Sequence, residues 1–232
     1  MNLITNVIDD KIVELRINRP ESRGSLSRQL VKDLKSQLDF FMEEKAPRVI
    51  LLSSEGSIFS AGADLKERKS MSYDDIQVWL KDLHALMDKI ESYEVPILAS
   101  IQGPALGGGF ELAMACDFRI CTKNTFFQLP EINLGIIPAG GGTIRLPQLV
   151  GKSLAFEMIM FARKLSSEEA LKHHLVLKVC ESESELKSQT LEIASQIARL
   201  PPIAVRSVKR AIHGSLYQDL KSRSKFEIKH YD

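Results

Sequence analysis

Two glutamates in glycine-rich, apolar surroundings are the side chains of this 232-residue chain best suited to acid–base chemistry. Glu111 follows three consecutive glycines at 107–109, and Glu131 lies twenty residues further along, directly after Pro130. The residues that flank Glu111 are Phe, Leu, Ala and Met, and none of them carries a positive charge. Because a buried carboxylate is costly unless it is paired or hydrogen-bonded, we interpret Glu111 as a functional residue.

Two carboxylates that share a dry site can hold complementary protonation states, as general acid–base catalysis requires. The structural alternative is that the two acids cap helices or bond backbone N–H groups. Two further features favour catalysis on a carbonyl compound. The small-residue stretch Ala61-Gly62-Ala63 lets a carbonyl approach backbone donors. The glycines at 107–109 predict a strand–turn–helix unit, which places N–H groups at the positive end of a helix.

The composition is that of a soluble globular protein and gives no global attraction to nucleic acid or membrane. The chain has 44% hydrophobic and 26% charged residues with a formal net charge of +1, so any anion site must be local. The N-terminal segment carries acids where a signal peptide needs a basic start, and no run of eighteen uncharged apolar residues occurs. We therefore expect a cytoplasmic protein without a membrane partner.

Motifs that would carry other chemistry fail on inspection. Gly151-Lys152-Ser153 resembles the end of a phosphate-binding loop, but Leu146 stands where that motif needs a glycine. Neither a G-x-G-x-x-G nor a G-x-S-x-G pattern occurs. The stretch 199–232 holds eight Lys/Arg against three Asp/Glu, which fits a solvated helix face or a cationic rim for a phosphorylated ligand.

The cysteines also give no sign of a metal site. There are three of them, and their spacing fits neither a disulfide framework nor a zinc site. We expect reduced, mostly buried thiols at Cys116, Cys121 and Cys180, and no bound metal.

Hydrophobic periodicity predicts one α/β domain in which strands and helices alternate. The apolar run at 49–52 is typical of a strand covered on both faces. A small-residue loop at 57–66 and a charged, mobile connection at 67–70 follow it. The predicted strands are 3–8, 12–17, 49–52, 97–101, 118–121 and 175–180. The predicted helices start at Ser27 and stop before Pro47, then span 75–92, a short segment containing Glu111, 143–162 with a break at Gly151, 185–198 and 203–221.

Four segments, in this order and spacing, resemble the enoyl-CoA hydratase/isomerase (crotonase) family. They read SAGADLK at 60–66, GPALGGGFE at 103–111, LPE at 129–131 and IPAGGGT at 137–143. The match extends from the β-hairpin that strands 3–8 and 12–17 are expected to form to about Tyr217. Because family members normally continue past the position of Asp232, we expect that the chain is truncated or lacks the last helices.

The resemblance implies both a fold and a class of substrate. The implied fold is an α/β crotonase-like spiral of β-β-α units at 1–165, followed by a helical C-terminal trimerisation region at 166–232. The implied substrates are acyl-CoA thioesters, and the implied assembly is a homotrimer or a homohexamer. The chemistry needs no metal and no cofactor beyond the coenzyme A that belongs to the substrate.

Carried over residue by residue, the resemblance also assigns roles at the site. Ala63 and Gly108 correspond to the two backbone N–H donors of the oxyanion hole. Glu111 and Glu131 correspond to the two catalytic acids of the hydratases. The residues expected along the thioester or near the water site are Ala61, Asp64, Leu65, Lys66 and Ala139. The implied reaction is syn addition of water across a trans-2-enoyl-CoA, in which Glu111 activates the water and Glu131 delivers a proton to C2.

Three functions stay open at this point. A 2-enoyl-CoA hydratase of fatty-acid or branched-chain acid breakdown is the leading hypothesis, because isomerases of the family typically need only the downstream acid, Glu131. An enoyl-CoA isomerase is the nearest alternative. A non-catalytic or RNA-binding role is the third, since some relatives bind RNA. The near-neutral net charge and the lack of alternating aromatic and basic residues argue against nucleic acid as the main partner.

Overall fold

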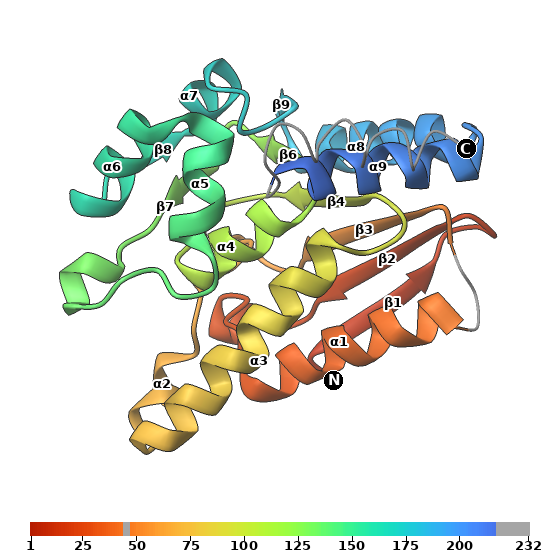
Figure 1. The fold of residues 1–232 in the computed structure, drawn as a ribbon. Coiled ribbons are helices and arrows are strands. Elements are labelled where there is room, and N and C mark those ends of the chain that lie inside the picture. The colour runs from red at the N-terminus through yellow and green to blue at the C-terminus, as the bar shows by residue number, and fades with distance from the viewer. Residues whose placement is uncertain (44–46, 217–232) are drawn as a thin grey trace.

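A six-stranded sheet forms the centre of the computed structural model, which describes residues 1–43 and 47–216 (Figure 1). Its strands lie in the order β1-β2-β3-β4-β6-β9. The first two strands form the predicted antiparallel hairpin, and every later pair in this sheet is parallel. The strands are β1 (Leu3–Val7), β2 (Ile12–Ile17), β3 (Val49–Ser54), β4 (Ile97–Ile101), β6 (Phe118–Thr122) and β9 (Lys178–Cys180).

A smaller sheet of three short strands lies beside the first, in the order β5-β7-β8. Its strands are β5 (Ala105–Leu106), β7 (Phe126–Gln128) and β8 (Leu165–Ser166). The helices of the described chain are α1 (Arg28–Glu43), α2 (Leu65–Lys69), α3 (Tyr73–Glu91), α4 (Gly108–Ala115), α5 (Gly142–Val150), α6 (Lys152–Met160), α7 (Ser167–Lys172), α8 (Glu183–Ala198) and α9 (Pro202–Leu216), with 3₁₀ turns η1 (Pro20–Ser22) and η2 (Glu131–Leu134).

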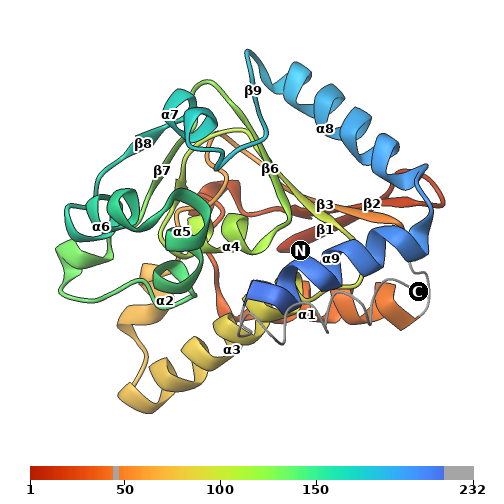
Figure 2. The same cartoon turned by 45° about the horizontal axis from the view of Figure 1, so that its top comes forward.

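Strand β3 shows why the large sheet needs helices on both faces. Successive side chains of a strand point to opposite faces, and all four residues at 49–52 are buried. Val49 and Leu51 belong to one apolar cluster, which α8 covers, whereas Ile50 and Leu52 belong to a second cluster shared with α1 and α3. Figures 1 and 2 show α8 and α1 on opposite sides of the sheet. The prediction of a strand buried on both faces is confirmed.

Helices α1 and α3 form where the apolar spacing predicts them, and local capping sets their starts. The Ser27 hydroxyl accepts the N–H of Leu30 at 3.2 Å, and Ser72 and Asp75 form a capping box at the start of α3. The buried face of α3 includes Trp79, which belongs to the core. That face is made of Trp79, Leu83, Leu86, Met87 and Ile90.

The predicted element order misses several short elements, among them helix α7. The segment expected to be a loop and a charged connection contains helix α2, because the Asp64 carboxylate accepts the N–H groups of Lys66 and Glu67 and so caps a helix there. The three strands of the small sheet were not predicted, since segments of two or three residues carry no readable periodicity. The break at Gly151 is confirmed, because it separates α5 from α6.

The C-terminal part of the described chain is helical, as predicted. Helix α8 packs on β3, β4 and β6, and α9 follows it and is joined to the residue before β6 by the Lys209–Asp117 ion pair. The predicted end of the last helix at 221 lies outside the described residues. The division of the chain at 165/166 stays a prediction. Within the described ranges, no helix combines the length and apolarity needed to span a membrane.

Candidate active site

Glu111 lies on the first turn of α4, where two backbone N–H groups hold its carboxylate. Its Oε1 accepts the N–H of Gly140 and the N–H of Gly142, each at 2.7 Å. The residue is only 2% exposed. A Cβ added to Gly140 would lie 2.5 Å from Oε2, so the second glycine run is required for this close approach. Glu111 is therefore buried as expected. The hydrogen bonds from the segment at 140–142 offset the cost of burying its carboxylate.

The surroundings of Glu111 act on its pKa in opposite directions. Burial raises the pKa of this carboxyl above its usual range, because the charged form loses water. The N–H groups of Gly142 and Gly140 oppose the shift, as do the nearby side chains of His84 and Arg145. The Glu111 carboxylate is therefore a stronger base than a carboxylate in water. The N–H groups of Gly140 and Gly142 hold its charged oxygen in place.

Glu131 begins the 3₁₀ turn η2 and comes to the same place through the small sheet. Strand β7 pairs with β5, and the N–H of Gly107 donates to the carbonyl of Gln128 at 2.9 Å. That pairing brings Glu131 against Gly107, where an added Cβ would lie 2.7 Å from its Oε1. The N–H of Glu111 donates to the carbonyl of the same glycine at 3.0 Å. The two acids therefore flank a single glycine turn.

One oxygen of Glu131 has no partner. Its Oε2 is buried and makes no hydrogen bond within the described chain. Burial and, to a lesser extent, the charge of Glu111 raise the pKa of Glu131 to about 7, although its own backbone N–H and Arg68 act to lower it. A carboxyl with this pKa can both donate and accept a proton near neutral pH.

The N–H groups of Ala63 and Gly108 lie next to each other, as an oxyanion hole requires. A Cβ added to Gly108 would be 3.7 Å from the nitrogen of Ala63. Gly62, with φ +84°, allows this approach, because an added Cβ there would lie 3.0 Å from the nitrogen of Gly108. Among the described residues, neither N–H has a hydrogen-bond acceptor. Gly108 also starts α4, so the helix dipole adds positive potential at this point.

The other residues predicted along the thioester have different surroundings. The Asp64 carboxylate accepts from Arg19 at 2.9 Å and from Ser25 at 3.2 Å while it caps α2. This side chain therefore fastens the loop that carries Ala63. Leu65 is 57% exposed, and Lys66 is exposed beside it.

Two alanines complete the predicted set. The N–H of Ala61 donates to the carbonyl of Arg23 at 2.9 Å, which joins its loop to the segment before α1. Ala139 is half-buried and directly precedes the Gly140 N–H that binds Glu111. Ala139 is therefore the sequence neighbour of a residue that binds Glu111, and its place near the water site stays a prediction.

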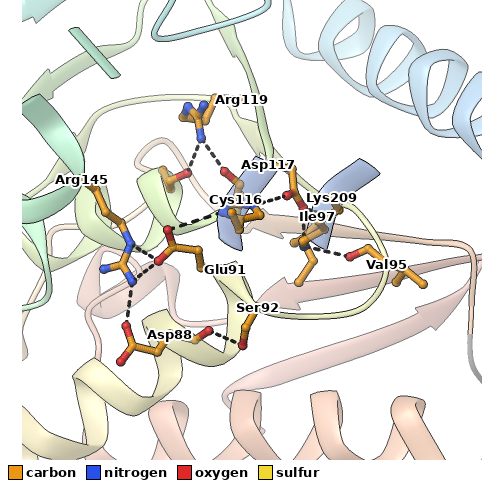
Figure 3. Close-up of polar contacts among 12 residues, drawn as sticks. Asp88, Glu91, Ser92, Val95, Ile97, Cys116, Asp117, Arg119, Arg145 and Lys209 are labelled. Atoms are coloured by element: carbon orange, nitrogen blue, oxygen red, sulfur yellow. Dashed lines mark hydrogen bonds and ion pairs between the residues drawn. The ribbon is translucent and has the colours of Figure 1, made fainter. Parts of the chain in front are cut away.

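Arg145 is a residue of this region that the sequence interpretation did not identify. Its guanidinium donates to the carbonyl of Gly140. It also donates to the carboxylates of Asp88 and Glu91 (Figure 3). The side chain is 6% exposed. The sequence offered one sign of this residue. Arg145 is a cation between the apolar residues Ile144 and Leu146, three residues after a glycine run.

The basic C-terminal stretch does not form a free cationic rim in its described part. Lys209 is buried and pairs with Asp117 at 2.7 Å (Figure 3), so the solvated-face interpretation is also wrong for this residue. Arg206 and Arg210 pair with Glu94. Arg199 is exposed, and the basic residues from 221 on lie outside the described residues.

A cavity of about 600 Å³ lies between the end of α4 and helix α9. Apolar side chains such as Met114, Leu149 and Val208 line it, and its lining includes neither Glu111 nor Glu131. Within residues 1–43 and 47–216, no three His, Cys, Asp or Glu side chains gather as metal ligands would. The three cysteines are buried and free, as predicted.

Comparison with known proteins places this geometry in a family. The sequence model described as "Enoyl-CoA hydratase/isomerase" matches residues 8–232. Methylglutaconyl-CoA hydratase from Homo sapiens mitochondria is 41% identical over 90% of this chain and 63% of its own length. A probable enoyl-CoA hydratase from Bacillus subtilis is 36% identical over 100% of this chain and 90% of its own. The crystal structure of enoyl-CoA hydratase from Bacillus anthracis superposes with a TM-score of 0.96 at 38% identity, over 100% of this chain and 90% of that one. The predicted crotonase-like fold is therefore confirmed, and the chain belongs to the enoyl-CoA hydratase/isomerase family.

Proposed function

We propose that this protein hydrates trans-2-enoyl-CoA thioesters to 3-hydroxyacyl-CoA by syn addition of water. The family acts on acyl-CoA thioesters. The observation that carries the finer proposal is the unequal pair of acids around Gly107. The Glu111 carboxylate is held by two N–H groups, whereas Glu131 keeps a buried oxygen without a partner.

The first part of the mechanism polarises the thioester. The carbonyl oxygen of the substrate accepts the N–H groups of Ala63 and Gly108, which have no competing acceptor among the described residues. As negative charge develops on that oxygen, the two donors and the N-terminus of α4 stabilise it. Withdrawal of electron density along the conjugated system makes C3 electrophilic, so that water can attack there.

The two acids then divide the proton transfers. The hydrogen bonds from Gly140 and Gly142 favour the charged form of Glu111, which accepts a proton from the attacking water. Burial and the like charge of Glu111 favour the protonated form of Glu131, which delivers its proton to C2. The C2–C3 double bond is replaced by one C–O and one C–H bond. No electrons are gained or lost overall, so the proposed reaction calls for no redox cofactor.

An enoyl-CoA isomerase is the second candidate. Moving a double bond along the acyl chain requires proton removal at one carbon and proton return at another, and a single acid near neutral pKa can do both. The partnerless oxygen and the pKa of about 7 at Glu131 fit that task. In an isomerase, Glu111 would have no role in proton transfer although two N–H groups orient it. This favours hydration.

The decisive experiment is turnover of a panel of acyl-CoA thioesters. The panel contains trans-2-enoyl-CoA substrates of several lengths, a branched dicarboxylic acyl group, and cis-3-enoyl-CoA for the isomerase. Hydration is followed by loss of the ultraviolet absorbance of the conjugated thioester. We expect loss of absorbance with the trans-2 substrates and formation of 3-hydroxyacyl-CoA. Isomerisation without hydration, or salt-dependent RNA binding without any turnover, would replace the proposal.

We also propose a homotrimer or a homohexamer, in the cytoplasm. Exposed apolar side chains on α8 and α9 support self-association, because soluble monomers rarely expose large apolar patches. These side chains are Leu191, Ile203, Val208 and Ile212. Sedimentation at micromolar concentration tests the assembly, and a stable monomer would contradict it.

A further inference from the structure

We propose that Arg145 is a positioning residue for the hydration reaction, because it fixes the backbone segment whose N–H groups hold Glu111. This inference rests on the proposed function and deepens it by naming a residue outside the predicted set. Arg145 does not contact the reacting atoms in this proposal. It acts through Gly140 and Gly142.

The contacts between Arg145 and the glycine segment are direct. Its Nη1 donates to the carbonyl of Gly140 at 3.2 Å, and the N–H of that same glycine donates to Glu111 at 2.7 Å. Gly140 therefore accepts a hydrogen bond from Arg145 through its carbonyl and donates one to Glu111 through its N–H. Gly141 has φ +103°, and an added Cβ there would lie 2.0 Å from Nη1. The glycine between the two amides thus leaves space for the guanidinium.

The guanidinium is itself held from the other side by helix α3. Nε and Nη2 both donate to Oε2 of Glu91, at 2.9 and 2.5 Å, and Nη2 also donates to Asp88 at 2.9 Å (Figure 3). Burial alone would raise the pKa of Glu91, but contacts with His213 and Arg145 lower it to about 2. The Glu91 carboxylate that holds Arg145 is therefore charged at every pH at which the enzyme would be assayed.

This anchoring matters because the held segment consists of glycines. Three consecutive glycines have more backbone freedom than any other tripeptide. A planar guanidinium can bridge a carbonyl and two carboxylates at once, which a lysine ammonium on a flexible stem does less well. Movement of the segment by about 1 Å would tilt Glu111 away from the attacking water, and a displacement of that size can cost about 100-fold in rate.

A purely structural role is the alternative, because the same ion pairs also join α3 to α5. The two roles differ in which step they affect. If Arg145 orients Glu111, its loss slows water addition more than it slows proton exchange at C2, which depends on Glu131. If the residue only stabilises the fold, a folded variant retains both reactions in the same proportion.

The test compares Arg145→Met and Arg145→Lys with the parent and with Arg163→Met. Arg163 is the matched control, since it also bridges two carboxylates, those of Glu157 and Glu169, but joins α6 to α7. For crotonyl-CoA we expect Arg145→Met to lower kcat about 10–100-fold with little change in KM. Exchange of the C2 proton of 3-hydroxybutyryl-CoA should fall less. Arg163→Met should leave both reactions unchanged.

The pH profile separates the charge of Arg145 from its geometry. Ionisable groups around Glu111 are His84, Arg145 and Glu131, with Arg68 acting on the last. Arg145 favours the charged form of Glu111, so its removal raises the pKa of this acid, and the acid limb of kcat should move to higher pH in Arg145→Met. In Arg145→Lys the charge is kept, so the limb should move little while kcat stays low.

The possible outcomes are distinguishable. Equal loss of hydration and of C2 exchange in a folded Arg145→Met protein, or full activity in that protein, would overturn the inference. Should Arg145→Met fail to fold, Arg145→Lys carries the same comparison of hydration with exchange. Failure of the parent protein to hydrate any enoyl-CoA would instead refute the proposed function.

Discussion

Glu131 lies directly against Gly107, with its Oε1 2.7 Å from the position that a Cβ would take on that glycine. Gly107 has φ +50° and forms the N-cap of α4, so it turns the chain toward Glu111 while it leaves space for Glu131. A side chain at this position would push the two acids apart. The proximity of the acids is what makes their protonation states interdependent.

The raised pKa of Glu131 predicts a basic limb in the pH–rate profile of hydration. In the proposed mechanism this acid must be protonated to deliver its proton to C2, and its pKa is about 7. Activity should therefore fall as the pH rises through about 7. The measurement is kcat/KM for crotonyl-CoA between pH 5 and 9. A profile that stays flat up to pH 9 would show that Glu131 is not the proton donor.

We expect activity to depend on the backbone N–H of residue 108. It should not depend on that residue being a glycine. An added Cβ there would meet only ordinary contacts, the nearest at 3.4 Å from Leu26, so Gly108→Ala keeps the donor and should keep most activity. Gly108→Pro removes the donor at the first position of α4, where proline is tolerated. Loss of one oxyanion donor typically costs about 10²–10³ in rate. Steady-state kinetics of the two folded variants make the comparison, and equal activity would contradict the oxyanion hole.

The sequence predicted the acids but could not predict how the chain joins them. Glu111 and Glu131 stand out locally, because each is a charge among glycines and apolar residues. Their meeting depends on β5 pairing with β7, and strands of two or three residues leave no periodic pattern. The strand at 49–52 was readable for the opposite reason, since burial on both faces leaves a continuous apolar run.

Arg145 was missed because its function depends on distant partners. Its ion pair with Glu91 spans 54 positions, and nothing near Arg145 in the sequence indicates that a glutamate on another helix will face it. Asp64 shows the same limit. The motif assigned Asp64 to the loop along the thioester, but it could not indicate that the carboxylate bonds Arg19 and caps α2. A local pattern identifies a residue type that suits chemistry, but only the fold gives its partners.

His213 should make the stability of the protein depend on pH. Contacts with Asp117 and Glu91 raise its pKa to about 9, above the value of 6.5 for an unperturbed histidine. A group with a raised pKa contributes its stability fully below the unfolded value and loses it as pH rises through the folded one. His213→Gln should therefore lower Tm at pH 6 by roughly 2–4 °C, with the difference shrinking towards pH 9.5.

The control for this effect is His174→Asn, an exposed position with φ 57° that asparagine tolerates. Thermal unfolding of the parent and both variants at pH 6, 8 and 9.5 gives the comparison. A Tm difference for His213→Gln that is the same at all three values would mean that the imidazolium charge is not involved.

The separate roles of the two acids give the sharpest test of hydration against isomerisation. Glu111→Gln and Glu131→Gln keep volume and hydrogen-bonding capacity while they remove acid–base function. At position 111 the amide oxygen can still accept the N–H groups of Gly140 and Gly142, so the fold of the second glycine run should survive. General acid–base catalysis is worth roughly 10²–10⁴ in rate, and hydration should fall by that order in both variants.

The two variants should differ in every reaction that involves only the C2 proton. Glu131 has the partnerless oxygen and the pKa near 7, so Glu131→Gln should abolish C2 exchange and any residual double-bond isomerisation, whereas Glu111→Gln should retain both better. Because residues that act as a unit are non-additive, the double variant should hydrate little more slowly than the worse single one. The assays are absorbance for hydration, deuterium incorporation for exchange, and conversion of cis-3-enoyl-CoA for isomerisation. If Glu111→Gln hydrates as fast as the parent, the two N–H groups hold an acid that the reaction does not use, and the isomerase takes the place of the hydratase.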